Sequence, residues 1–263
     1  MSFFKSEKFQ KIFYPIFYIL FTVAITISGC FIFSRYYYTN IFVSGPSMLP
    51  TLVGDDTKNI HHYGIADTTD KSIDSLKRFD VVITYYPSSW GAKDGLIVKR
   101  VWGFPGETIN LVSNKEGSTF TVSRGGEVVY TIEAQIKEKQ VDKISSIETM
   151  LVYQYVIPSK EFNTHITGKY TKSETGELNV TEITGGARNI NNLTLGENQY
   201  FVMGDNWIDS TDCYTKMSNA EKLTRNDIQG RVICIQGYGK VVKQDINVYK
   251  IVDKNPIRPI YNF

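Results

Sequence analysis

The strongest constraint on this chain is an uncharged hydrophobic run near its start. Ile12–Phe33 comprises 22 consecutive residues without a charged side chain. As an α-helix, with a rise of about 1.5 Å per residue, the run would be roughly 33 Å long, close to the thickness of the hydrocarbon core of a bilayer. Pro15 lies near its start, where a helix tolerates proline. The run therefore predicts one transmembrane helix over residues 12–33.

The charges on either side of this run predict its orientation. Three lysines precede it, whereas Arg35 alone follows it directly. Because cytoplasmic flanks carry the excess of lysine and arginine, residues 1–11 are expected in the cytoplasm and residues 34–263 outside the cell membrane. A cleavable signal peptide is the rival interpretation, but this run is too long and Ser34–Tyr38 is a poor cleavage site. Its length also argues against a buried core helix.

Composition narrows the fold and function of the remaining residues. The chain has 17 Tyr and 15 Phe, many in alternating runs, which favours a mainly β fold. The net charge of +2 is spread along the chain without a basic stripe, so nucleic acid is not an expected partner. Three histidines and three cysteines are too scattered to predict a metal or other cofactor site. A disulfide between Cys213 and Cys234 is an alternative that their spacing does not decide.

Several segments of the soluble part carry strand patterns. Residues 61–78 are polar and are expected to form a surface loop. A β-rich insertion or second lobe is expected over about residues 110–198. The predicted strands are Asp80–Tyr86, Leu96–Trp102, Phe120–Ser123 and Glu127–Ile132 in a hairpin turned by Arg124–Gly126, Gln199–Met203, and Ile228–Ile235.

The stretch Val43–Leu52 lies just beyond the membrane run and contains Ser47. Gly45 and Pro46 precede this serine and favour an irregular, exposed turn. One interpretation is a plain loop that leads from the membrane anchor into the folded domain. The other is a nucleophile, which would require a base elsewhere in the chain to accept the serine proton.

A lysine is the candidate base. His61 and His62 lie in the predicted loop and His165 in the uncertain lobe, so all three are expected to be exposed structural residues. Lys99, in a predicted strand, shares its face with apolar Ile97 and Val101. Burial there would lower the lysine pKa from about 10.4 toward 7–8, at a cost of roughly 3–5 kcal/mol. An ordinary solvated strand lysine is the alternative.

Four segments, in order, resemble the motifs of the type I signal peptidases, which are membrane-anchored Ser/Lys proteases. Together they touch about 40 residues, and the membrane run agrees with the resemblance. Any one segment would be weak, whereas four in the same order are specific. The segments are Ser44–Leu52, Arg78–Val82, Lys99–Ile109, and Gly204–Asn206 followed by Ser210 and Asp212.

The resemblance implies a role for each matching residue. Ser47 would be the nucleophile, Lys99 the general base, and Ser210 the residue that orients the lysine. The Ser47 N–H would help to form the oxyanion hole. Gly45 stands where some members carry a serine hydroxyl, so a second donor would come from elsewhere. Three further residues would support the lysine structurally: Asp205, Arg100 and Asp212.

The last segment departs from the family pattern. Trp207, Cys213 and Tyr214 stand where typical members carry Arg, Ser and Arg. Asp212 would therefore lack its neighbouring arginine. Either the loop that holds Ser210 is loosened, or Arg100 or Arg231 compensates.

The implied function is that of a membrane-bound serine endopeptidase that removes signal peptides from secretory precursors after small residues. The long insertion raises the hypothesis of a specialised member that serves a surface-protein or pilus locus. The altered last segment motivates an alternative, a catalytically weak relative that acts as a binding or assembly factor. A self-cleaving Ser/Lys protein of the phage-repressor type is a third class, but such proteins usually begin with a DNA-binding domain.

Overall fold

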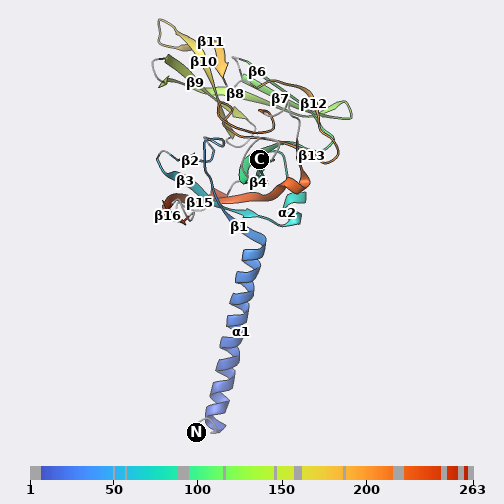
Figure 1. Ribbon diagram of the computed structural model, residues 1–263, viewed down its shortest axis with the longest axis vertical. Helices are drawn as coiled ribbons and strands as arrows, with labels where there is room; N and C mark the ends of the chain where they lie inside the picture. The colour runs from blue at the N-terminus through green and yellow to red at the C-terminus, as the bar shows by residue number, and fades with distance from the viewer. Residues whose placement is uncertain are drawn as a thin grey trace. The chain divides into compact units, whose positions relative to one another are not determined.

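The computed structural model describes eleven stretches of the chain and divides it into two compact units, Met1–Thr39 and Asn40–Phe263. The first unit contains helix α1, and the second is mainly β (Figure 1). The described residues are 7–49, 51–56, 58–87, 95–114, 117–144, 147–156, 162–185, 188–215, 222–243, 248–253 and 258–259.

Helix α1 comprises Glu7–Tyr37 and includes the whole predicted span. Residues 10–37 of it are long and apolar enough to cross a membrane, and none of the most apolar window is buried against protein. Two hydroxyls in the run donate to backbone oxygens one turn earlier, Thr22 to Tyr18 at 2.8 Å and Thr26 to Thr22 at 2.9 Å. These bonds satisfy polar groups that would otherwise be costly in lipid.

The first sheet contains ten strands within the described residues. Its main order is β1-β3-β15-β4-β5-β13-β14, with β2 paired to β3 and both β16 and β17 paired to β15. The strands are β1 Tyr38–Phe42, β2 Gly54–Asp55, β3 Ile60–Asp67, β4 Val81–Tyr85, β5 Leu96–Gly103, β13 Gln199–Met203, β14 Leu223–Thr224, β15 Ile228–Lys243, β16 Val248–Asp253 and β17 Arg258–Pro259.

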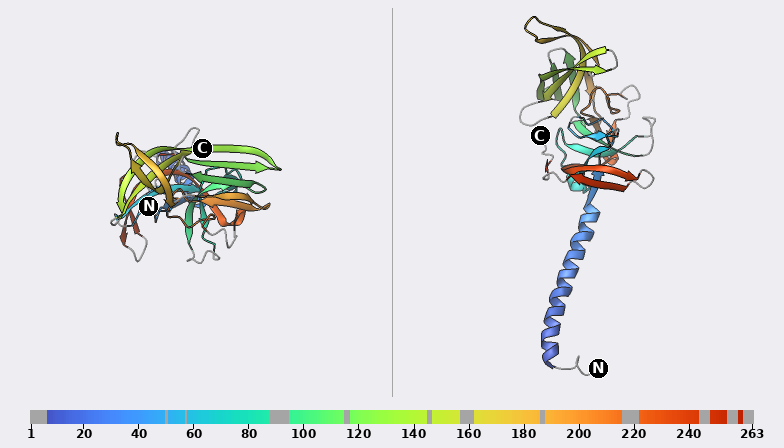
Figure 2. Two further views of the ribbon diagram at one scale, coloured as in Figure 1. Left: turned by 90° about the horizontal axis from the view of Figure 1, so that it is seen from above. Right: turned by 90° about the vertical axis from the view of Figure 1, so that its left-hand side faces the viewer.

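The second sheet contains seven strands in the described residues, in the order β11-β10-β9-β8-β7-β6-β12 (Figures 1 and 2). Strands β7 and β8 form the predicted hairpin around Arg124–Gly126. The fold is therefore mainly β with one apolar N-terminal helix, as expected. The strands are β6 Thr108–Asn114, β7 Gly117–Arg124, β8 Glu127–Ile144, β9 Ile147–Val156, β10 Phe162–Lys172, β11 Leu178–Gly185 and β12 Ile190–Thr194.

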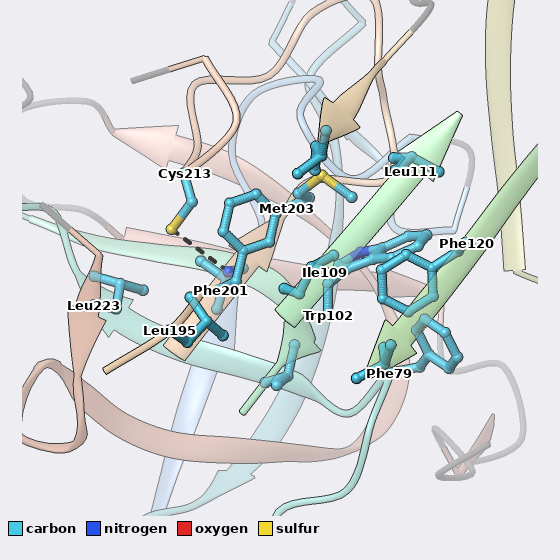
Figure 3. Close-up of a cluster of buried hydrophobic side chains, with 14 of the residues drawn as sticks. Phe79, Trp102, Ile109, Leu111, Phe120, Leu195, Phe201, Met203, Cys213 and Leu223 are labelled. Atoms are coloured by element: carbon cyan, nitrogen blue, oxygen red, sulfur yellow. Dashed lines mark hydrogen bonds between the residues drawn. The ribbon is translucent and has the colours of Figure 1, made fainter. Parts of the chain in front are cut away.

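An aromatic cluster joins the two sheets. Trp102 of β5 meets Phe120 of β7 edge to face, with ring centroids 4.9 Å apart, and Phe79 in the same way at 5.1 Å. Ile109 and Leu111 of β6 are fully buried in the same cluster (Figure 3). Because these side chains come from both sheets, their burial holds the strand that carries Lys99 against the second sheet.

A buried carboxylate reinforces this junction. Glu107 accepts from Arg78 at 2.7 Å and from Arg124 at 3.1 Å. Its other oxygen accepts the Phe104 N–H at 2.8 Å, so the turn between β5 and β6 is closed by the same side chain. The carboxylate is thereby paired and hydrogen-bonded, as a buried charge must be.

The prediction of a surface loop over residues 61–78 is wrong. Strand β3 covers its first part, and a short helix, α2 Asp70–Asp74, follows. His61 is 1% exposed and its Nδ1 lies 2.9 Å from the Val43 oxygen, while His62 Nδ1 accepts the Val53 N–H at 2.8 Å. The polar composition misleads because these histidines find backbone partners and β3 pairs with the distant strand β15.

The expectation of exposure is thus wrong for His61, and the side chain of His165, in β10, lies outside the described part. Cys213 and Cys234 are both free thiols. The disulfide alternative is therefore wrong in this structure.

We expect Trp102→Ala to lower the free energy of unfolding by about 3–5 kcal/mol, because it removes the largest fully buried side chain and leaves a cavity between the sheets. Val128→Ala, on an exposed position of β8, should change it by less than about 0.5 kcal/mol. Thermal unfolding of the full chain in detergent micelles measures both. Equal midpoints for the two variants would contradict the proposed junction.

Candidate active site

Ser47 lies in a tight turn whose backbone closes on itself. Gly45 has φ +79°, a left-handed conformation that other residues adopt only with strain. The Leu49 N–H donates to the Pro46 oxygen at 3.0 Å, and Leu52 N–H to the Met48 oxygen at 2.9 Å. Met48 and Leu52 are both buried in the core of the first sheet. These apolar anchors fix the turn.

Lys99 reaches this turn from the middle of the first sheet. It lies on β5 directly opposite Val82 of β4 and is 3% exposed. Its Nζ is 2.7 Å from Ser47 Oγ. Burial lowers the pKa of Lys99 from 10.5 to about 8, against the opposing pull of the Asp212 and Asp205 carboxylates. The Lys99 amine and the Ser47 hydroxyl are therefore within hydrogen-bond distance, and burial favours the neutral form of the amine.

The next residue on β5 ties the strand to the loop after β13. Arg100 donates two hydrogen bonds to the Asp205 carboxylate, Nε to Oδ1 at 2.8 Å and Nη2 to Oδ2 at 2.6 Å. Its Nη1 donates to the Phe79 oxygen at 2.7 Å. Both side chains are fully buried. Such a two-pronged pair sets geometry more than it adds stability.

The loop after β13 packs directly on the serine turn. Asn206 donates its backbone N–H to the Ser47 oxygen and its side-chain amide to the Pro46 oxygen, each at 3.0 Å. Gly204 lies between these segments, and a Cβ there would collide with the Ser47 oxygen and the Ser210 side chain. Glycine is therefore required for the loop to approach the turn this closely.

Ser210 lies in the same contact region, next to Gly204. It is 9% exposed, and its Oγ is buried without a hydrogen-bond partner among the described residues. Its role in orienting Lys99 stays a prediction.

Asp212 has an arginine partner that sequence analysis missed. Arg188 Nη1 donates to Asp212 Oδ1 at 3.0 Å, and both side chains are almost fully buried. The expectation that Arg100 or Arg231 compensates is wrong: Arg100 is engaged by Asp205, and Arg231 Nη1 lies 3.7 Å from Asp80 Oδ2. Arg188 precedes β12, 24 residues before Asp212, and no local spacing signals the contact.

Two of the three residues that depart from the family pattern contact this arginine. The Arg188 guanidinium carbon lies 4.5 Å from the ring centroid of Tyr214 and 5.9 Å from that of Trp207. Arg188 Nη2 also donates to the Trp207 oxygen at 3.3 Å. The aromatic substitutions thus form a platform for a guanidinium that comes from another segment.

Cys213 is a packing residue rather than a second nucleophile. Its Sγ accepts the Val202 N–H at 3.5 Å (Figure 3), and its own N–H donates to the Val202 oxygen at 3.2 Å. Complete burial raises the pKa of the thiol to about 12. Because the thiolate is the reactive form, this cysteine is inert at physiological pH.

The chain combines a mainly β fold, a helix long enough to cross a membrane, and a buried lysine that contacts the Ser47 turn. These are features of a membrane-anchored peptidase. The family model for signal peptidase, peptidase S26, matches residues 15–236, which include every residue of the site described above. The chain therefore belongs to the signal peptidase family. None of the curated proteins compared with the chain matches it.

The depressed pKa of Lys99 makes a stability prediction. Between pH 8 and 10.5 the unfolded chain binds a proton that the folded chain does not, so stability rises with pH there. Below pH 8 the folded state bears the full cost, about 3 kcal/mol. We expect Lys99→Met to raise the free energy of unfolding by roughly 2–3 kcal/mol at pH 7 and by almost nothing near pH 10.5.

Thermal midpoints of the full chain in detergent at the two pH values measure this difference. Lys71→Met, at an exposed position of α2, is the matched control and should leave the midpoint unchanged at both. A destabilised Lys99→Met at pH 7 would contradict the assigned cost of burial.

Proposed function

We propose that this chain is a membrane-bound serine endopeptidase in which Ser47 and Lys99 form a catalytic dyad. Its reaction is the removal of signal peptides from exported precursors, after small residues. The observation that carries the proposal is the 2.7 Å separation of Lys99 Nζ from Ser47 Oγ, for a lysine that is 3% exposed. A lysine base must be neutral to accept a proton, and burial favours the neutral form.

Acylation follows from these positions. Neutral Lys99 accepts the proton of Ser47 Oγ as the oxygen attacks the carbonyl carbon of the scissile peptide bond. The Ser47 N–H stabilises the negative charge that develops on the carbonyl oxygen. When the tetrahedral intermediate collapses, the Lys99 ammonium gives its proton to the departing amine. The signal peptide is then held as an ester on Ser47.

Deacylation uses the same lysine, which is neutral again. Lys99 takes a proton from a water molecule, the resulting hydroxide attacks the ester carbonyl, and the proton returns to Ser47 Oγ. Ser210 is assigned to orient the lysine by the resemblance of its loop to the last family motif, and it lies beside Gly204, which packs on the Ser47 turn. Asp205, with Arg100, holds the loop after β13 against β5, and Asp212 holds the Ser210 loop from the other side.

The membrane helix sets the substrate class. With residues 1–11 in the cytoplasm and the span over 12–33, residues 34–263 form the catalytic domain on the outer face. An insertion or second lobe over about residues 110–198 is part of this proposal. Precursors whose signal peptides occupy the same membrane are the natural partners. Service to a surface-protein or pilus locus is a narrower form of this hypothesis.

Coexpression with a secretory precursor tests the dyad. We expect wild type to process the precursor and both Ser47→Ala and Lys99→Ala to leave it unprocessed, because each removes one reacting group. Ser44→Ala is the matched control, since its exposed hydroxyl lies in the same turn and bonds Asp56 at 3.2 Å instead. Equal processing by wild type and Lys99→Ala would overturn the proposal.

The same experiment separates the binding-factor alternative. A Ser47→Ala strain that keeps the cellular phenotype lost on deletion would favour a binding or assembly factor. If the wild-type phenotype is kept only when both Ser47 and Lys99 are present, the result supports the peptidase.

The pH dependence of turnover provides a second prediction. Activity requires neutral Lys99, so kcat/KM should rise with pH and level off above an apparent pKa of about 8. Lys99→Arg should be inactive throughout, because guanidinium does not lose its proton in this range. Rates of precursor cleavage by the purified full chain from pH 6 to 10 measure the profile. A rate that is flat with pH would contradict the lysine-base assignment.

A further inference from the structure

We propose that Arg188 is a positioning residue for the dyad, supplied by the segment that enters the second sheet at β12. The inference rests on the proposed function of Ser47 and Lys99. Arg188 is 1% exposed, and its guanidinium is engaged by a carboxylate, a backbone oxygen and an aromatic ring. A buried arginine with such specific partners, and no contact with solvent, fixes a local geometry.

The contacts of Arg188 lead in short steps to Ser47 and to the loop that carries Ser210. Arg188 holds Asp212 Oδ1, and Asp212 Oδ2 accepts the Gly204 N–H at 2.9 Å. Gly204 in turn packs against the Ser47 oxygen. On the other side, Asp212 carries the Ser210 loop, whose N–H groups at Tyr214 and Thr215 also bind Oδ1, at 3.1 and 3.3 Å.

The backbone of Arg188 is itself anchored. Ser113 of β6 donates its hydroxyl to the Arg188 oxygen at 2.9 Å, and its N–H to Asn189 Oδ1 at 2.9 Å. The Asn189 N–H donates to the Tyr214 hydroxyl at 3.4 Å. The arginine therefore enters the site from a fixed edge of the second sheet, between β6 and the Ser210 loop.

Arg188 also acts on Lys99 through charge. The charges that act on Lys99 are those of Asp205, Asp212, Arg188 and Cys213, and its Nζ lies 2.7 Å from Ser47 Oγ. Each carboxylate raises the pKa of Lys99, whereas the positive charge of Arg188, which is paired with Asp212, lowers it. Without the guanidinium, Asp212 would stand unbalanced beside the lysine, and the Lys99 pKa would rise.

The variants separate positioning from mere folding. Arg188→Gln removes the positive charge. Arg188→Lys keeps the charge but removes the planar guanidinium that binds Asp212 and the Trp207 oxygen together. Arg188→Gln combined with Tyr214→Arg supplies a guanidinium from a residue already beside Asp212. Arg78→Gln is the matched control, because Arg78 also joins the two sheets through a buried carboxylate but does not touch the Asp212 loop.

Cleavage of a secretory precursor by the full chain in detergent gives kcat, KM and the pH profile. We expect Arg188→Gln to lower kcat by about 10- to 100-fold with KM changed less than about threefold, since the dyad is displaced but the substrate surface is not. Its kcat/KM profile should shift to higher pH. Arg188→Lys should keep the wild-type pH profile of kcat/KM. The double variant should have a kcat at least about tenfold above that of Arg188→Gln. Arg78→Gln should lower the thermal midpoint and leave the profile in place.

Each outcome decides the matter. An unshifted profile in Arg188→Gln, or one shifted equally in Arg188→Lys and Arg78→Gln, overturns the positioning role. If Arg188→Gln does not fold, an alkaline shift in Arg188→Lys or a failure of the double variant to regain activity overturns it. Equal cleavage by wild type and Lys99→Ala removes the dyad and this inference with it. Loss in Lys99→Ala with wild-type kinetics in Arg188→Gln removes this inference alone.

Discussion

The site depends on keeping the Lys99 amine out of water while two carboxylates lie close by. Either carboxylate alone would favour the ammonium form and raise the pKa of Lys99. Each is instead held by a buried arginine, Asp205 by Arg100 and Asp212 by Arg188. Buried pairs of this kind return little net stability after desolvation. Their value here is electrostatic balance and fixed position, which a pair of apolar residues would not supply.

Local periodicity was enough to predict much of this arrangement. The alternation along residues 96–102 put Lys99 on a face with Ile97 and Val101, and of the two alternatives, buried or solvated, the buried one is correct. The membrane-length run, the β7–β8 hairpin and the strand before Gly204 follow from equally local signals. Strand β3 was missed because its polar residues are satisfied by backbone groups and by pairing with β15, which begins more than 150 residues later.

The partner of Asp212 was beyond prediction for a related reason. In the sequence, Trp207, Cys213 and Tyr214 are three separate departures from the last family motif. In the folded chain they form one environment: a ring and a carbonyl oxygen that receive Arg188, and a neutral buried thiol that packs against β13. The positive charge beside Asp212 comes from Arg188, in another segment of the chain. A tertiary contact of this kind leaves no spacing pattern in the sequence.

The contact between Arg188 and Asp212 ties the Ser210 loop to the second sheet. Lys99 lies on β5, which leads directly into β6, and β6 holds the Arg188 backbone through Ser113. Arg188 binds Asp212, whose loop begins at the end of β13, and β13 pairs with β5. The contacts therefore close a ring that starts and ends on the strand of the lysine. A shift of any one member would therefore disturb the contacts of the others, so Arg188 links the second sheet to the loop that packs on the Ser47 turn.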